Sequence, residues 1–170
     1  ELTEASIKTT ELSGRDIDRQ GFAHFFLKEI SEAQDSMGRT LHNRWKIDRD
    51  AGHKFVNLDT AQIPEKIKTA FKQGQIKKIY CVGQGTAGVA AQAIADIVRY
   101  YLPIKDLYVS AMKASELSGF FVDENNGDMS DTLVIAISQS GTTADTNRAV
   151  DMVKAQGART LCIVNRRDSD

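Results

Sequence analysis

The sequence predicts an α/β fold, a three-layer αβα sandwich around a parallel sheet, preceded by an N-terminal helix. Three observations predict it. Short apolar runs alternate with helical segments from residue 76 to residue 164, as in successive right-handed βαβ units. The apolar runs show little alternation of polar and apolar residues, which is typical of strands covered on both faces. An amphipathic helical pattern starts near Phe22, ahead of the first run.

The N-terminal part divides into two segments. Residues 1–20 are polar and lack a sustained period, which is typical of a leader or linker. Residues 21–62 contain a predicted helix, followed by an irregular connection over 43–62. The helix is predicted because apolar residues recur at spacings of three and four and so share one face. These residues are Phe22, Phe25, Phe26, Ile30, Ala33, Met37 and Leu41.

Residues 63–170 are predicted to form the sheet domain. Pro64 favours the start of a short helix that runs to Phe71. The pattern then predicts strands over 76–82, 107–110, 133–137 and 160–164, and helices over 89–101, 114–121 and 143–156. The chain stops just after the last of these strands, which leaves that strand without a covering helix. We therefore expect the domain to be truncated at its C-terminus, as a fragment of a longer protein.

The composition limits the classes of partner. The chain has 170 residues, of which 41% are hydrophobic, and this suits one ordinary globular domain of roughly 100–200 residues. Its 22 basic and 23 acidic residues leave a formal net charge of −1, so electrostatics favours neither nucleic acid nor a membrane as partner. No apolar run reaches the ~18 residues of a membrane span. The polar N-terminus has no signal-peptide pattern.

The cysteines and histidines indicate neither a metal nor a cofactor. Cys81 and Cys162 each lie in an apolar run, where a small core thiol is the ordinary interpretation. None of the three histidines belongs to a pair with metal-ligand spacing. Reduced cysteines are typical of a cytoplasmic protein. We therefore expect a cytoplasmic domain that holds no metal and needs no cofactor.

The strongest candidate site is the loop of residues 138–143, between a predicted strand and its following helix. Hydroxyl groups surround Gly141, which lets the backbone curl close to a ligand. The loop consists of Ser138, Gln139, Ser140, Gly141, Thr142 and Thr143. A helix N-terminus presents unpaired N–H groups and a partial positive charge, so it stabilises an anion without a lysine. The pattern predicts a phosphate site; alternatively, one hydroxyl caps the helix and the others face solvent.

A second loop, residues 83–88, follows the first strand of the sheet. It reads Gly83, Gln84, Gly85, Thr86, Ala87 and Gly88, the pattern GxGxxG of dinucleotide-binding folds. That interpretation needs an acid at the end of the next strand to hold a ribose, and residues 109–113 contain none. Alternatively, the loop is a tight turn whose N–H groups and Thr86 hydroxyl lie beside the same ligand. Both loops leave the carboxyl ends of strands, where such sheets bind ligands.

The segment Ser138–Thr146 resembles the sugar-phosphate loop of the SIS (sugar isomerase) family, Ser-x-Ser-Gly-x-Thr. It is most similar to the isomerase domains of the glutamine–fructose-6-phosphate aminotransferases, or glucosamine-6-phosphate synthases. These read Ser-Gln-Ser-Gly-Glu-Thr-Ala-Asp-Thr, and here Thr142 replaces the glutamate. Two further segments match that family, the helical segment His24–Glu32 (HFFLKEISE) and Ala114–Glu116. The likeness spans about residues 21–165.

The resemblance implies a flavodoxin-like or Rossmann-like SIS fold and a site for a sugar phosphate. By this likeness, contacts to the phosphate and sugar of fructose 6-phosphate or glucosamine 6-phosphate come from Ser138, Gln139, Ser140 and Thr143. The family's first-strand loop, Gly-Thr-Ser, also touches the ligand, and here one of its hydroxyls is lost. The ligand is then a phosphorylated sugar or amino sugar of open identity. The resemblance also implies a homodimer and a second SIS half in the full-length protein.

Three functions remain open from the sequence. The leading one is the sugar-phosphate-binding part of an aldose–ketose isomerase or aminotransferase of amino-sugar synthesis. The second is a non-catalytic sugar-phosphate sensor or regulatory module, a role that SIS domains also fill. The third is a dinucleotide-binding domain, against which the missing ribose acid argues. No catalytic residue is assigned, because the family's glutamate, histidine and lysine lie in the second SIS half.

Overall fold

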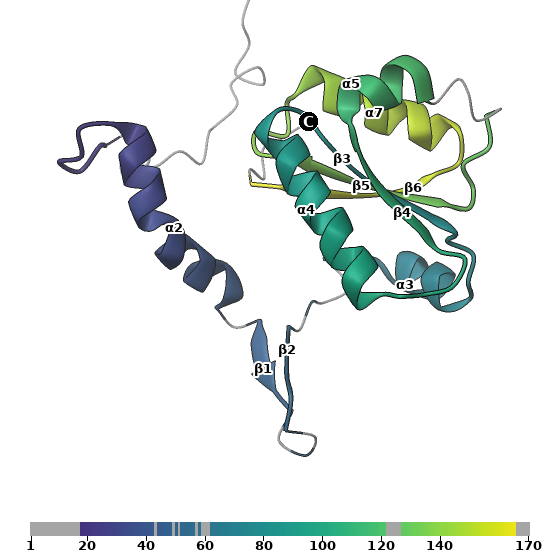
Figure 1. Cartoon of the computed structure of the whole chain (residues 1–170), viewed down its shortest axis with the longest axis horizontal. Helices are drawn as coiled ribbons and strands as arrows, with labels where there is room; N and C mark the ends of the chain where they lie inside the picture. Colours follow the sequence, from purple (N-terminus) through teal and green to yellow (C-terminus); the bar gives the residue numbers. More distant parts are fainter. Residues whose placement is uncertain are drawn as a thin grey trace, which may run out of the picture. The chain divides into compact units, whose positions relative to one another are not determined.

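A computed structural model describes residues 18–42, 44–48, 50, 52–56, 58, 62–121 and 127–165. It divides into two compact units, Glu1–Gln62 and Ile63–Asp170, and its elements carry the labels of Figure 1. Most of the predicted leader lies outside the described residues, and so does the end of the chain after Asn165. Each unit is described by itself.

The first unit contains the predicted N-terminal helix and a hairpin that was not predicted. Helix α2 spans Phe25–Leu41, in agreement with the apolar spacing. Strands β1 (Trp45–Ile47) and β2 (Lys54–Val56) pair antiparallel. The expectation of an irregular connection over 43–62 was therefore wrong. Strands of three residues are too short for their alternation of side chains to be distinguished from a loop.

The second unit is built on a parallel four-stranded sheet, as predicted. Its strands are β3 (Lys78–Gly83), β4 (Tyr108–Lys113), β5 (Thr132–Ser138) and β6 (Arg159–Val164), in the order β4-β3-β5-β6. The central strands β3 and β5 are buried along almost their whole length. In the register of the sheet, Gly83 at the end of β3 lies beside both Lys113 and Ile137. The carboxyl ends of three strands therefore meet at one edge.

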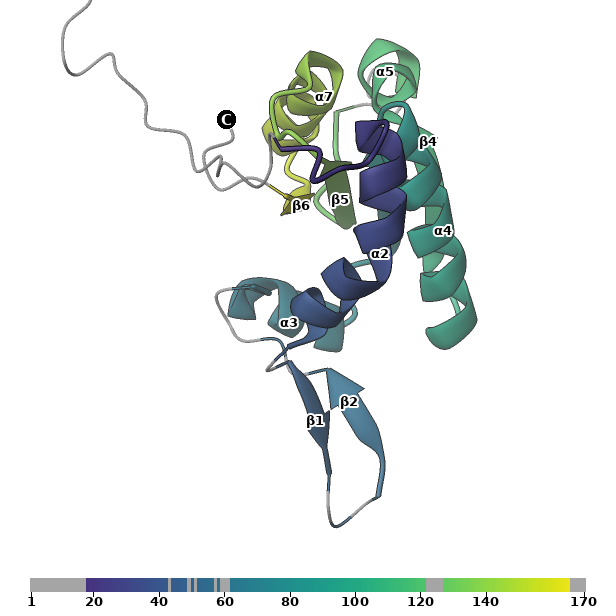
Figure 2. The same ribbon diagram turned by 90° about the vertical axis from the view of Figure 1, so that its left-hand side faces the viewer.

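Helices cover both faces of this sheet, which gives the predicted three layers (Figures 1 and 2). Helices α3 (Glu65–Lys72) and α4 (Thr86–Tyr101) pack on one face, against Ile79 and Cys81. On the other face lie the short helix α5 (Ala114–Glu116), the π-helix η2 (Leu117–Phe121) and α7 (Ala144–Ala155). Their buried residues Ala114, Leu117, Ala149 and Val153 pack with Tyr80, Val82 and Val134 of the sheet.

Three helix boundaries differ from the prediction, each for a local reason. Helix α4 begins at Thr86 rather than Val89, because the turn is completed by Gly85 with φ +58°. The single helix expected over 114–121 is one turn of α-helix that widens into the π-helix. Thr143 is the residue that precedes α7 rather than its first helical residue. Elsewhere the ends of the elements move by one to three residues, and β4 ends at Lys113, three residues later than predicted.

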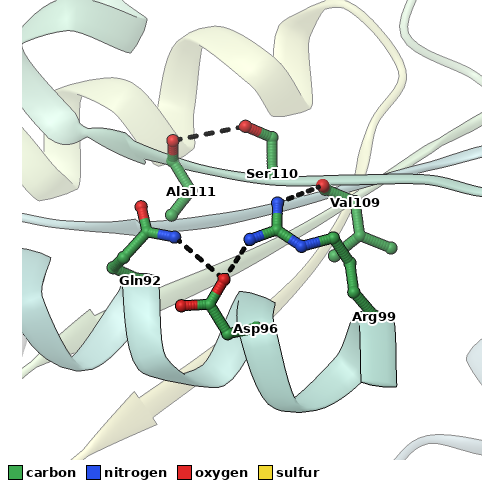
Figure 3. A network of polar contacts seen from close by, with 6 residues as sticks. All are labelled: Gln92, Asp96, Arg99, Val109, Ser110 and Ala111. Atoms are coloured by element: carbon green, nitrogen blue, oxygen red, sulfur yellow. Dashed lines mark hydrogen bonds and ion pairs between the residues drawn. The ribbon is translucent and has the colours of Figure 1, made fainter. Parts of the chain in front are cut away.

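A polar network ties α4 to the edge strand β4 (Figure 3). Asp96 accepts hydrogen bonds from Gln92 Nε2, at 3.2 Å, and from Arg99. Arg99 Nη1 in turn donates to the carbonyl oxygen of Val109, at 3.1 Å. This carbonyl points away from β3, because the preceding residue of β4 is the one that bonds toward β3 and alternate residues bond to opposite sides. The arginine therefore occupies an open acceptor of an edge strand, which would otherwise be free to pair with another chain.

Candidate functional site at the carboxyl edge of the sheet

The two predicted loops lie at the same edge of the sheet, on neighbouring strands. The loop of residues 83–88 leaves β3, and the loop of residues 138–143 leaves β5. Because Gly83 pairs with Ile137, the residues that follow them start about one strand spacing apart, roughly 4.8 Å. Each loop leads directly into a helix, α4 or α7, so two helix N-termini point toward this edge. The site is therefore assembled from two successive strand-to-helix turns.

The loop after β5 is folded by its own hydroxyl groups. Ser138, which is 6% exposed, accepts a hydrogen bond at Oγ from the N–H of Gly141 at 3.0 Å. Gly141 is itself buried, and its φ of +71° is a conformation that favours glycine. Ser140 Oγ accepts from both the N–H and the hydroxyl of Thr142, at 3.2 and 3.1 Å. The loop is thus a tight, internally bonded turn.

The start of α7 carries no side-chain cap. Thr143 occupies the capping position, but its hydroxyl makes no capping hydrogen bond and instead lies 3.4 Å from Ser138 Oγ. The N–H of Asn147 donates to the carbonyl oxygen of Thr143, which closes the first turn of the helix. The alternative in which one hydroxyl caps the helix does not describe this loop. Within the part of the chain that the structure describes, no serine or threonine side chain accepts a hydrogen bond from the N–H groups of the first turn of α7, so they remain as donors.

The predicted residues of this loop differ in their exposure. Ser138 and Gly141 are buried and hold the turn together, whereas Ser140 and Thr143 are half-buried. Gln139 is exposed, and its side chain makes no hydrogen bond within the described part of the chain. One further residue was missed from the sequence. Asn147 Nδ2 donates to the carbonyl oxygen of Gly141, six residues earlier, at 3.2 Å and holds the loop from the first turn of α7.

The glycines of the loop after β3 serve the packing of α4. A Cβ atom on Gly83 would lie 2.5 Å from the backbone C and O atoms of Ala87, in the first turn of the helix. A Cβ atom on Gly88 would lie 3.2 Å from the carbonyl oxygen of Gly83. Gly85 has open space around it but adopts φ +58°. Two of the three glycines therefore allow a helix and a strand end to touch, and the third allows the turn.

The loop of residues 83–88 contains two other predicted site residues, and both lie at the carboxyl edge of the sheet. Thr86 is exposed at the first position of α4, and Gln84 is half-buried directly after β3. Gln84 Oε1 accepts hydrogen bonds from both the N–H and the hydroxyl of Ser115, each at 3.4 Å. Ser115 was not predicted as a site residue, although the Ala114–Glu116 match to the family pointed to its segment. This contact connects the loop after β3 to α5, the short helix that directly follows β4.

The charged groups of this edge are few. Lys113, the last residue of β4, lies 3.7 Å from Glu116, and both side chains are exposed. Asp145 is an exposed acid in the first turn of α7. Among the described residues, histidine, cysteine, aspartate and glutamate form no group of three or more that could hold a metal ion. The site, as far as the structure describes it, is made of hydroxyls, amides and main-chain N–H groups.

Comparison with known proteins places this fold in a family. The family model of the SIS domain matches residues 74–170, more than half of the chain, and this stretch contains both loops. The chain belongs to the SIS domain family. This confirms the resemblance inferred from the sequence, and it makes the chain a sugar-isomerase-type domain. None of the helices that the structure describes is long and apolar enough to cross a membrane.

Several relatives of this SIS domain are glutamine–fructose-6-phosphate aminotransferases. The chain is 31% identical over 150 residues to the isomerizing aminotransferase of Bradyrhizobium diazoefficiens, covering 88% of this chain and 22% of that protein. It is 34% identical over 149 residues to that of Methanococcus maripaludis, covering 87% of this chain and 20% of the relative. The chain thus spans about a fifth of the length of these relatives.

Solved structures agree with this placement. The C-terminal domain of glucosamine-fructose-6-phosphate aminotransferase from Francisella tularensis superposes with a TM-score of 0.67 at 27% identity. The match covers 89% of this SIS domain chain and 37% of that protein. Tagatose-6-phosphate ketose/aldose isomerase from Escherichia coli superposes with a TM-score of 0.66 at 18% identity, over 86% of this chain and 36% of that one. At that identity the second likeness concerns the fold alone.

Proposed function

We propose that the chain binds a sugar phosphate of the fructose 6-phosphate or glucosamine 6-phosphate kind. In this proposal it is the first SIS half of an aldose–ketose isomerase or aminotransferase of amino-sugar synthesis. The observation that carries the proposal is the uncapped start of α7 behind the hydroxyl-lined loop of residues 138–143. Family membership supports the sugar-phosphate ligand, and the aminotransferase relatives support the reaction.

The phosphate would be held by donors that the loop leaves free. Ser140 Oγ already accepts two hydrogen bonds, so its own proton is available to a phosphate oxygen. An anion at a helix N-terminus gains about 0.3–1 kcal/mol, and up to ~2 kcal/mol when partly buried. Each hydrogen bond to a charged group contributes about 1.5–3 kcal/mol. Two or three such contacts suffice for binding in the millimolar range, about 4 kcal/mol, without a lysine.

The chain positions the substrate in this proposal, and other groups carry out the proton transfer. Aldose–ketose isomerisation moves a proton between neighbouring carbons and needs a general base. Glu116, an acid three residues beyond the end of β4, is exposed and paired with Lys113, and we assign it no such role. A phosphate fixed at one end of the sugar orients its reacting carbons, which is a large part of catalysis. We propose that a second SIS half supplies the base, within a homodimer.

Calorimetric titration tests the proposed phosphate site in the loop of residues 138–143. We expect the chain to bind fructose 6-phosphate and glucosamine 6-phosphate but not unphosphorylated fructose. Ser140→Ala should weaken binding about tenfold, because it removes one hydrogen bond to a charged group. Ser130→Ala is the matched control, since it removes an exposed hydroxyl just before the opposite, amino-terminal end of β5, the strand that the loop follows. Equal affinity of Ser140→Ala and the unaltered chain, or equal binding of fructose and fructose 6-phosphate, would contradict the proposal.

A sensor module and half of an enzyme differ in turnover rather than in binding. The interconversion of fructose 6-phosphate and its aldose isomer, measured with the full-length protein that contains this chain, separates them. Turnover that Ser140→Ala reduces supports the enzyme. Binding without turnover would instead favour a regulatory module. Titration with reduced nicotinamide cofactor, followed by its fluorescence, should show no binding.

A further inference from the structure

Helix α4 is apolar on both of its sides. Its inner side packs on the sheet through Ala91 and Ala95, which are fully buried. A surface helix usually has a polar outer side, and a helix that is apolar all round is usually buried. The outer side of α4 is nevertheless in solvent, since Val89 is 71% exposed, Ile97 55% and Tyr100 78%. Within the part of the chain that the structure describes, this side has no cover.

The exposed side of α4 has the same pattern in both directions. Five exposed residues lie opposite the buried side at spacings of three, four, four and three, and they are Thr86, Val89, Ala93, Ile97 and Tyr100. At 3.6 residues per turn they fall within about 80° of one another around the helix axis. The stripe is symmetric about Ala93, its smallest residue: β-branched side chains flank the alanine, and hydroxyl-bearing side chains end the stripe.

Such a stripe matches a second copy of itself. Val89, Ala93 and Ile97 form one ridge along α4, and ridges of this kind on two helices interdigitate when the helices cross at about −50°. A two-fold interface uses the same patch on both subunits. When two antiparallel copies of α4 cross at Ala93, Val89 lies beside Ile97 of the partner subunit. Tyr100 lies farther out, where the two helices diverge, and its long side chain fills the widening gap.

The charges of α4 permit this contact. Asp96 and Arg99 are the only charged residues of the helix, and they pair with each other. Both belong to the polar network at the border of the stripe (Figure 3). Like charges brought together across an interface cost several kcal/mol, and here each acid already has its own base. The helix therefore meets its copy without electrostatic repulsion.

The exposed area is also of the size that a dimer needs. Tyr100 and Tyr101 are 78% and 73% exposed, so together they leave roughly 300 Å² of side chain in water, because one aromatic side chain can bury about 150–250 Å². Leu102 and Ile104, directly after the helix, are exposed as well. Apolar patches of more than a few hundred Å² mark interaction sites, and each partner of an ordinary complex buries about 800 Å².

We propose that the outer side of α4 is the surface through which two copies of this chain associate, with the two helices antiparallel and crossing at Ala93. The occupant is a second copy because a partner of another kind would not require a stripe that is symmetric about its centre. This inference goes beyond the proposed function, because it gives the homodimer a location. It does not depend on a sugar-phosphate ligand, since the contact is made by apolar residues of the helix.

Sedimentation velocity of the whole chain, without any sugar phosphate, tests the interface. We expect a species of twice the monomer mass of 18.8 kDa that dissociates on dilution. Ala93→Glu should weaken the dimer at least tenfold, because it brings two carboxylates together at the crossing. The variant should melt like the unaltered chain, since Ala93 is exposed. Ala155→Glu is the matched control, because it makes the same change at an exposed position of α7, on the other face of the sheet.

A charge exchange tests the antiparallel register. Val89→Glu and Ile97→Lys should each weaken the dimer, whereas the two combined in one chain should associate more tightly than either alone, because opposite charges then lie side by side across the interface. A double variant weaker than both single variants overturns the antiparallel crossing. A chain that is monomeric at every concentration, or a dimer that Ala93→Glu leaves intact, overturns the interface itself and assigns the face to another partner. Neither result changes the expected binding of fructose 6-phosphate, so the proposed function is judged separately.

Discussion

Substitution of Gly83 by alanine tests the interpretation of the GxGxxG loop as a packing device. The added Cβ would lie 2.5 Å from two backbone atoms of Ala87 and 2.9 Å from the N atom of Gly88, whereas ordinary contact begins at 3.4 Å. These atoms belong to the first turn of α4, so no side-chain rotation relieves the clash. The helix or the strand end has to move.

The cost of that movement follows from what α4 covers. Ala91 and Ala95 are fully buried against the sheet, and their small size lets the helix sit close to it. Overpacking of a well-packed core costs typically about 1–3 kcal/mol and sometimes more. Because the clash is with backbone atoms, we expect the upper end of this range, a loss of about 3 kcal/mol in the free energy of unfolding. For a domain of this size that corresponds to a drop in Tm of roughly 10 °C.

Thermal unfolding followed by circular dichroism measures this effect. Gly119→Ala is the matched control, because a Cβ atom there meets nothing within 4 Å and the residue does not adopt positive φ. We expect its Tm to stay within a few degrees of that of the unaltered chain. Equal melting temperatures of the two variants would refute the packing argument and would return the loop glycines to a purely ligand-related role.

Two further predictions concern the edge strand and the core thiol. Arg99→Ala removes the donor to the Val109 carbonyl, and it should lower the free energy of unfolding by at most about 1 kcal/mol, because the side chain is partly exposed. The variant should show increased self-association in light scattering, whereas the control Gln92→Ala should not. Burial raises the pKa of the Cys81 thiol from its ordinary 9.0 to about 11, so folding stability is complete below pH ~9 and falls as the pH rises toward 11. Cys81→Ala should flatten this decline in Tm. With a thiol reagent at pH 8, only the exposed Cys162 should react in the folded protein.

The sheet could be predicted because its signal is local and strong. Each of the four apolar runs is bounded by turn residues, and each became a strand within three residues of the expected ends. The hairpin of β1 and β2 could not be predicted, because Trp45–Ile47 and Lys54–Val56 are too short to show a period. The π-helix Leu117–Phe121 could not be predicted either, since the widened turn has no characteristic amino-acid pattern.

Some parts of the candidate site could likewise be predicted from the sequence, and others could not. The hydroxyl-rich loop of residues 138–143 was identifiable because its residue types exceed what one helix cap needs. Asn147 and Ser115 were not identifiable as site residues, because each acts on a partner that only the folded chain brings near. Asn147 bonds to a residue six positions earlier, and Ser115 of α5 donates to Gln84, which is 31 positions away. The first contact depends on the conformation of the turn and the second on the register of β3 and β4, and a linear pattern contains neither.

The two loops show why a glycine pattern by itself does not define a ligand. Gly83 and Gly88 are required by contacts between α4 and β3, which would exist with or without a bound molecule. Gly141, by contrast, serves a turn whose donors are not used up by the protein, because Thr143 leaves the start of α7 uncapped. What distinguishes a binding loop is therefore the hydrogen-bonding capacity that remains after the turn has formed. By that criterion the phosphate group of the proposed ligand is expected at the loop of residues 138–143, whereas packing alone accounts for Gly83 and Gly88 of the loop after β3.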